Sequence, residues 1–81
     1  MRQDAVLMRA AEALRRFEIY GYRVAYCLLE NEDLAMEAAM AALLELGADR
    51  RFVDAPPDAQ RRLVTRSVIR ASIAMKRRDA R

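Results

Sequence analysis

Apolar residues recur at spacings of three and four along three separate stretches, a pattern that predicts three helices and no strand. The first helix is expected from about residue 4 to residue 29, with Asp4 as its N-cap. Its apolar stripe consists of Leu7, Ala10, Leu14, Phe17, Gly21, Val24 and Leu28. Because Gly21 lies on this stripe, we favour a close helix crossing there over a break in the helix.

The second helix is expected from residue 32 to residue 46, with Asn31 as its N-cap and acidic residues in its first turn. Apolar residues occupy nearly all of its circumference, and only Glu37 and Glu45 interrupt them. Such a helix is either central in the domain or covered on its outer face by a partner. Gly47 is expected to end it as the C′ residue.

A linker is expected over residues 48–57, followed by a third helix over residues 57–78. Pro57 suits a helix start, so the cap is expected at Asp54 or Ala55. Phe52 and Val53 are expected to fold back on the core. At 100° per residue, one face of the third helix collects Leu63, Val64, Ser67, Val68, Ala71, Ala74 and Met75.

The opposite side of the third helix is basic. It carries Arg61, Arg62, Arg66, Arg70, Lys76 and Arg77. Ile69 and Ile73 fall among these cations, which leaves two interpretations open. The isoleucines are either scattered exposed residues, as protein surfaces often show, or the apolar centre of a contact surface with a basic rim.

The chain has 81 residues, which predicts one all-α domain over residues 1–81. Hydrophobic residues make up 54% of it, but many of them are alanines, which bury little area. A core this small is expected to gain from a partner or from a second copy of the chain. A homodimer is therefore one expected state.

The modest net charge of +3 hides a strong asymmetry along the chain. Residues 59–81 hold eight basic residues and one acid, while residues 30–58 hold eight acids and two arginines. An acidic middle and a basic tail point to a polyanion or to an acidic partner.

Several kinds of chemistry are not expected. The chain has no histidine and a single cysteine, Cys27, so neither a histidine base nor a thiolate zinc site can form, and we expect no metal, cofactor or enzymatic activity. A lone cysteine fits a reducing, cytoplasmic setting, and Cys27 is expected to be a small buried hydrophobe. No apolar run is long enough to predict a membrane span or a signal peptide.

One ordered set of residues is more specific than composition. It comprises Phe17, Tyr22, Arg23, Ala25, Leu28, Leu29, Asn31, Ala35, Glu37, Leu43, Leu44 and Leu46, with Lys76, Arg77 and Arg78 as a final basic cluster. This order resembles region 2 of the bacterial RNA polymerase sigma factors, especially the extracytoplasmic-function type, over nearly the whole chain. The resemblance implies a three-helix sigma-region-2-like bundle that binds promoter DNA and the polymerase core.

The second helix departs from the family pattern. The family docks on the polymerase core through an acid, a glutamine and a glutamate. Glu37 stands where the acid belongs, but Met40 and Ala41 replace the other two. Leu43 stands for an aromatic residue and Gly47 for a tryptophan, so a polar docking face has become apolar. These 81 residues contain no counterpart of the family's second promoter-reading domain, which implies a partial or split sigma subunit.

Two surfaces follow from these interpretations. Phosphate contacts of promoter DNA are assigned to Arg66, Arg70, Lys76, Arg77 and Arg78. Contacts with the polymerase core, a companion sigma subunit or another protein partner are assigned to Glu37, Met40, Ala41, Leu44, Ile69 and Ile73. The alternatives are a helical interaction module that keeps the fold without promoter function, and a small basic DNA-binding protein of another helical type.

Overall fold

A computed structural model describes residues 2–79, apart from the side chains of residues 2–4, 6 and 79. The chain forms α1 (Arg2–Leu29), α2 (Glu32–Gly47), α3 (Arg50–Val53) and α4 (Pro57–Asp79), and the described part contains no strand. The all-α prediction is confirmed, and the three long helices lie close to their expected ranges. The short helix α3 is an addition, since it forms inside the segment expected to be a linker.

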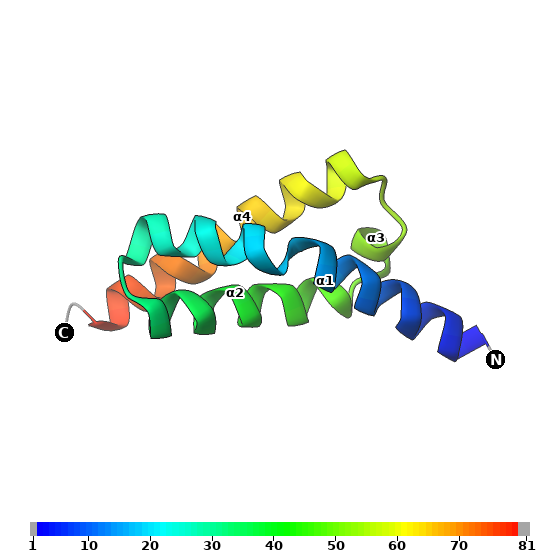
Figure 1. Cartoon of the computed structure of the whole chain (residues 1–81), viewed down its shortest axis with the longest axis horizontal. Helices are drawn as coiled ribbons and strands as arrows, with labels where there is room; N and C mark the ends of the chain where they lie inside the picture. Colours follow the sequence, from blue (N-terminus) through cyan, green and yellow to red (C-terminus); the bar gives the residue numbers. More distant parts are fainter. Residues whose placement is uncertain (1, 80–81) are drawn as a thin grey trace.

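The three long helices pack as an elongated bundle of 46 × 22 × 17 Å (Figure 1). The chain runs the same general way in α1 and α4 and returns in α2 (Figure 1). The first turns of α1 extend past the other helices at one end of the bundle. The end of α4 lies at the opposite end, beside the turn that joins α1 to α2.

The core is small and rich in alanine. Its buried hydrophobic side chains are those of Ala10, Ala13, Phe17, Ala25, Ala35, Ala38, Ala39, Ala42, Leu43, Leu46, Phe52, Val53, Val64, Val68 and Met75. Gly21 is buried among them, and α1 continues through it without a break, as expected. A Cβ at Gly21 would lie 3.6 Å from Val68 and 3.8 Å from Ala39, so this is where α1 meets both α4 and α2.

The ends of α2 bear out one prediction and correct another. The Asn31 side chain accepts a hydrogen bond of 2.9 Å from the backbone N–H of Leu34, which confirms it as the N-cap. Gly47 does not take the left-handed conformation of a C′ residue; it is the last residue of α2, and Ala48 is the C-cap. A Cβ at Gly47 would lie only 3.1 Å from Leu14 Cδ1, so close packing accounts for this glycine.

The beginnings of α1 and α4 also differ from expectation. Helix α1 starts at Arg2, so Asp4 lies inside the first turn and does not cap the helix. Leu7, expected in the core, is exposed. Ala10 is the first buried residue among the described side chains of α1, so the core begins one turn after Leu7. Helix α4 starts at Pro57 as expected. Its first hydrogen bond runs from the N–H of Gln60 to the backbone carbonyl of Pro56, so Pro56 takes the cap position that was expected at Asp54 or Ala55.

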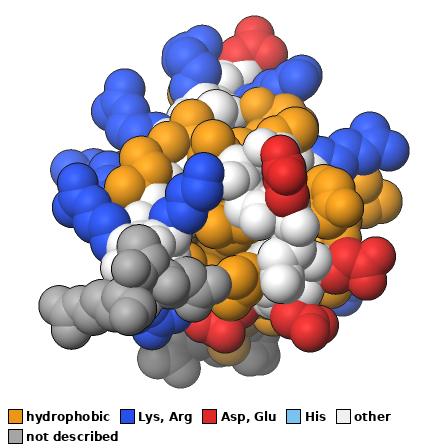
Figure 2. All heavy atoms as spheres, turned by 90° about the vertical axis from the view of Figure 1, so that its left-hand side faces the viewer, with side chains coloured by type: hydrophobic (Ala, Val, Ile, Leu, Met, Phe, Trp, Pro, Cys, Tyr) orange, Lys and Arg blue, Asp and Glu red, His pale blue; other side chains and the backbone are white. Residues whose placement is uncertain are grey.

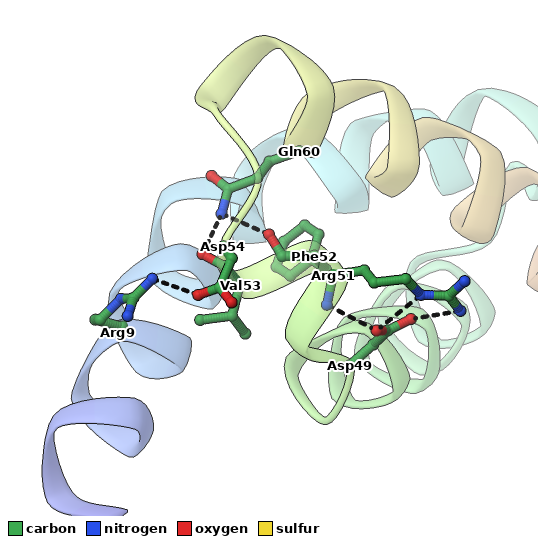
Figure 3. Close-up of polar contacts among 7 residues, drawn as sticks. All are labelled: Arg9, Asp49, Arg51, Phe52, Val53, Asp54 and Gln60. Atoms are coloured by element: carbon green, nitrogen blue, oxygen red, sulfur yellow. Dashed lines mark hydrogen bonds and ion pairs between the residues drawn. The ribbon is translucent and has the colours of Figure 1, made fainter. Parts of the chain in front are cut away.

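Helix α3 is held between the other helices by Phe52 and Gln60. Phe52 is completely buried, and its ring meets that of Phe17 edge-on with the centroids 6.3 Å apart. The buried Gln60 Nε2 donates to the backbone carbonyls of Phe52 at 3.0 Å and Val53 at 3.4 Å (Figure 3). The prediction that Phe52 and Val53 fold back on the core is confirmed.

The buried face of α4 is shifted from the expected one. Ala74, placed in the core from the sequence, is exposed, while Ser72 is completely buried. The core row of α4 runs through every fourth residue, from Gln60 through Val64 and Val68 to Ser72. Ser72 Oγ has no hydrogen-bond partner among the described residues.

Candidate nucleic-acid interface and apolar groove

The outer side of α4 carries a row of exposed cations, which we call the basic face. It consists of Arg62, Arg66, Arg70, Lys76 and Arg77. At 100° per residue these side chains point away from the buried Val64 and Val68. None of them takes part in an ion pair within the described residues. Four of the five predicted DNA-binding residues lie on this face.

Two isoleucines lie among these cations. Ile69 is 38% exposed and Ile73 is 44% exposed, so both stand on the outer side of α4 as the sequence pattern placed them. Ile69 also borders a shallow hollow of about 440 Å³ together with Arg62, Thr65 and Arg66. The basic face therefore has apolar positions between its charges.

Arg78, the fifth predicted DNA-binding residue, is engaged elsewhere. Its guanidinium lies 3.2 Å from a carboxylate oxygen of Glu37 on α2. Both side chains are mostly exposed, and such surface pairs contribute about 0–1 kcal/mol. The pair joins a residue predicted to contact DNA to one predicted to contact the polymerase, and partly neutralises both charges.

Arg61 is also engaged, because its guanidinium lies 4.6 Å from the centroid of the Tyr20 ring. The Tyr20 hydroxyl forms a 2.6 Å hydrogen bond with Thr65 Oγ1. This hydrogen bond and, after it, the Arg61 guanidinium lower the pKa of Tyr20 below its ordinary value. The network fixes the first half of α4 against α1 and so fixes the direction of the basic face.

A second surface lies between α1 and α2. It is an open groove of about 710 Å³, which we call the apolar groove. Its lining comprises Glu18, Ile19, Tyr22, Glu32, Asp33, Met36, Ala39, Met40 and Leu43. Ile19 is 68% exposed and Leu44, on the outer face of α2, is 61% exposed. Exposed apolar side chains gathered in this way are typical of a protein contact surface.

The structure separates the residues predicted to meet a protein partner. Glu37, Met40, Ala41 and Leu44 all lie on the exposed face of α2. Ile69 and Ile73 lie on α4, and none of the described side chains of α4 lines the apolar groove. In the single chain α2 is not buried on most sides, because Met36, Met40 and Leu44 are exposed. Of the two alternatives for this helix, an outer face free to meet a partner fits.

The rim of the apolar groove is acidic. Glu18 on α1 and Glu32 and Asp33 on α2 line it. Tyr22 stacks on Tyr26, with ring centroids 6.0 Å apart and planes at 27°. Burial raises the pKa of the Tyr22 hydroxyl, and the charge of Glu32 raises it further. The groove therefore combines an apolar floor with negative potential.

Figure 2 looks along the bundle from the end that holds the α1–α2 turn. Basic side chains occupy mainly its left and upper edges, and acidic ones mainly its right and lower edges. Hydrophobic side chains show between them. The charge asymmetry of the sequence is thus also an asymmetry in space.

Cys27 is exposed, which corrects the expectation that it is buried. It lies one residue before Leu28 and therefore about 100° off the apolar stripe of α1. No group of three or more potential metal ligands occurs in the described part of the chain. No described helix combines the length and apolar character that crossing a bilayer would need.

Three residues that matter for these surfaces were not singled out from the sequence. Ile19 and Met36 complete the apolar groove, and Gln60 holds α3. Gln60 could have been found from its place in the row of every fourth residue that includes Val64 and Val68. Ile19 lies off the core stripe, and only the exposure of its side chain shows that it borders a groove.

Comparison with protein-family models, with curated proteins and with solved structures gives no match. The resemblance to sigma region 2 therefore rests on the ordered residues of the sequence alone.

Proposed function

We propose that the chain binds DNA through the basic face of α4, as a sigma-region-2-like transcription protein that acts as a partial or split sigma subunit. The observation that carries the proposal is the row of five exposed cations without ion-pair partners in the described structure. From Arg62 to Arg77 the row spans about 22 Å, at ~1.5 Å per helical residue. That length matches about six phosphates of one DNA strand, at ~3.4 Å of helix axis each.

A sigma-like role also requires a contact with RNA polymerase. A sigma-like role would place the outer face of α2, with Glu37, Met40, Ala41 and Leu44, against the polymerase core or a companion subunit. That face is mostly apolar, and its acidic residue Glu37 already forms an ion pair with Arg78. Docking would therefore rely on burial of Met40 and Leu44 more than on polar contacts.

DNA binding can be tested by fluorescence anisotropy with duplex and single-stranded promoter DNA at low salt. Replacing two cations, as in Arg66→Ala/Arg70→Ala, is expected to weaken binding about tenfold through lost phosphate contacts. A matched control is Arg50→Ala/Arg51→Ala, which removes the same charge from α3 and is expected to change affinity little. Absence of binding at low salt, or equal losses in the two double variants, would refute the DNA role.

The polymerase part needs a separate experiment, namely co-purification of the chain with core RNA polymerase. Met40→Asp is expected to abolish co-purification because it places a charge in the apolar contact, while Arg66→Ala/Arg70→Ala is expected to leave it intact. Failure of the unaltered chain to co-purify would contradict the sigma-like role and leave DNA binding standing.

A second candidate function is a helical interaction module without promoter function. The apolar groove favours it, because the exposed side chains of Ile19, Met36 and Met40 line it from two helices. This function requires a protein occupant for the groove and no DNA. The co-purification and DNA-binding experiments together separate the two candidates.

A further inference from the structure

A second stripe runs along the solvent side of α1, at alternating spacings of three and four. It consists of Ala5, Met8, Glu12, Arg15, Ile19, Tyr22 and Tyr26. All seven side chains are exposed except that of Tyr22, which is half-buried. A strict alternation of three and four is the repeat with which one helix packs along another. A single chain leaves this stripe without a partner helix.

The order of residues along the stripe suits a second copy running in the opposite direction. If Glu12 lies opposite Arg15 of a second copy, the two-fold axis puts Arg15 opposite the other copy's Glu12. In an antiparallel register the residue numbers of every facing pair add up to the same value. Met8 therefore lies opposite Ile19 when Glu12 lies opposite Arg15. The stripe is therefore complementary to itself, with two ion pairs at its centre and apolar contacts on both sides.

The apolar groove extends this contact onto α2. Ile19 belongs both to the stripe and to the groove, where it lies with Met36 and Met40. In the antiparallel register, the first turns of the second copy's α1, which extend past its own bundle, reach the groove. Their positive helix end then lies near the acidic rim formed by Glu32 and Asp33.

Two arginines near the stripe, Arg9 and Arg16, are held by other side chains of the same copy. Arg9 forms an ion pair with Asp54, and Arg16 NH1 donates to Gln60 Oε1 at 3.1 Å. Both side chains are thus directed toward α3 and α4, away from the α2 side of α1 (Figure 3 shows the Arg9 pair). Repulsion from these two arginines across the contact is correspondingly reduced.

We propose that the chain forms a two-fold homodimer in which the exposed stripe of α1 packs antiparallel against its copy, with reciprocal Glu12–Arg15 pairs and with the apolar groove covered. The proposal rests on the second candidate function, in which the groove is a protein contact surface, and does not depend on DNA binding. Because Met40 lines the groove, a chain in this dimer cannot dock on polymerase through Met40. In such a dimer α4 stays outside the contact, so each copy keeps its basic face.

A charge-swap series measured by sedimentation equilibrium tests the register. The unaltered chain is expected to be a dimer, and Glu12→Arg alone or Arg15→Glu alone is expected to weaken it at least about tenfold by setting like charges opposite each other. The double variant Glu12→Arg/Arg15→Glu is expected to restore the dimer. A monomeric unaltered chain, or a double variant no better than the single ones, would overturn the proposal. Circular dichroism on every variant separates loss of the dimer from loss of the fold.

Disulfide trapping tests the orientation independently. In a Cys27→Ser background, Met8→Cys/Ile19→Cys is expected to give a cross-linked dimer on mild oxidation, whereas Met8→Cys alone gives little. The two positions are about 16 Å apart along one helix, so they cannot bridge within a chain. Efficient cross-linking by Met8→Cys alone would indicate a parallel contact and contradict the proposal. If the chain forms a stable dimer but does not bind DNA, only the DNA role is contradicted. If it binds DNA as a monomer, only the dimer is contradicted.

Discussion

Gly21 lies where α1 meets α2 and α4, yet the space around it would admit a methyl group. A Cβ there would lie 3.6 Å from Val68 and 3.8 Å from Ala39 and Leu43, which are ordinary contact distances. Gly21→Ala is therefore expected to stabilise the fold by up to about 1 kcal/mol, because alanine favours the helix. Urea denaturation measures this change. Gly47→Ala is the comparison: its Cβ would press on Leu14 at 3.1 Å, so it should gain less. A clear loss of stability in Gly21→Ala would contradict the packing described.

Among the described residues, Glu30 is the one with a positive φ angle, which is 50°. This left-handed conformation ends α1, and the N–H of Glu30 donates to the carbonyl of Tyr26 at 2.8 Å. Glu30→Gly is expected to stabilise the fold by about 1 kcal/mol, because glycine adopts this conformation without a Cβ clash. Glu30→Ala keeps the Cβ and should leave the urea midpoint nearly unchanged. Equal midpoints for the glycine and alanine variants would argue against strain at this residue.

At the level of elements, Gln60 links α3 to α4 through its bonds to the carbonyls of Phe52 and Val53. Gln60→Ala removes the side-chain donor to both carbonyls; the Phe52 carbonyl keeps the backbone N–H of Ala55 at 3.1 Å, while the Val53 carbonyl loses its donor. The expected cost is about 1 kcal/mol. Thermal unfolding followed by circular dichroism measures it. Gln60→Glu is a useful second variant, because it keeps the size of the side chain but loses the donor. If Gln60→Ala unfolded at the temperature of the unaltered chain, α3 would not depend on this link.

Asp49 caps α3 by accepting a hydrogen bond of 2.9 Å from the backbone N–H of Arg51. This bond, followed by the Arg51 side chain, lowers the pKa of Asp49 below its ordinary value. A lowered pKa in the folded state means that stability is present above the unfolded-state pKa, near 3.9, and is lost as pH falls through the folded-state value. Asp49→Asn should therefore reduce the acid sensitivity of the melting temperature below about pH 4. An unchanged pH profile in this variant would show that another acid controls it.

The long helices were predictable because their apolar periodicity is strong and their caps are ordinary, as Asn31 shows. The sequence also placed Phe52 and Val53 on the core, since two large apolar residues in a polar segment gain by burial. It could not show that they form a helix, because the four residues of α3 are too few for a period. The prediction that Asp4 caps the first helix was wrong because helical residues precede it. Leu7 is exposed because α1 is longer than α2.

The candidate surfaces were predictable to different degrees. The basic face could be read from the spacing of Arg62, Arg66 and Arg70, because the buried row of the same helix is well defined. The ion pair between Arg78 and Glu37 could not be predicted from the sequence. The two residues lie 41 positions apart and meet only because α2 packs on α4. The apolar groove likewise needs both helices, because neither Ile19 nor Met36 is distinctive on its own.

On the scale of the whole molecule, the two charge signs are separated onto different surfaces. The acids Glu18, Glu32 and Asp33 surround the apolar groove, while the basic face lies on α4. Separation of this kind allows one copy to contact a polyanion and a protein at the same time. It also keeps the negative rim of the groove away from bound DNA, which would otherwise be repelled.

The most direct test of the account is the salt dependence of DNA binding. If all five cations of the basic face contact phosphates, the slope of log K against log salt concentration should be about −4 to −5 for duplex DNA. Each alanine replacement on the face, such as Arg66→Ala, should reduce its magnitude by about one, whereas Arg50→Ala should not change it. A slope near zero, or one that Arg66→Ala and Arg70→Ala leave unchanged, would contradict the claim that the outer side of α4 is a DNA-binding surface.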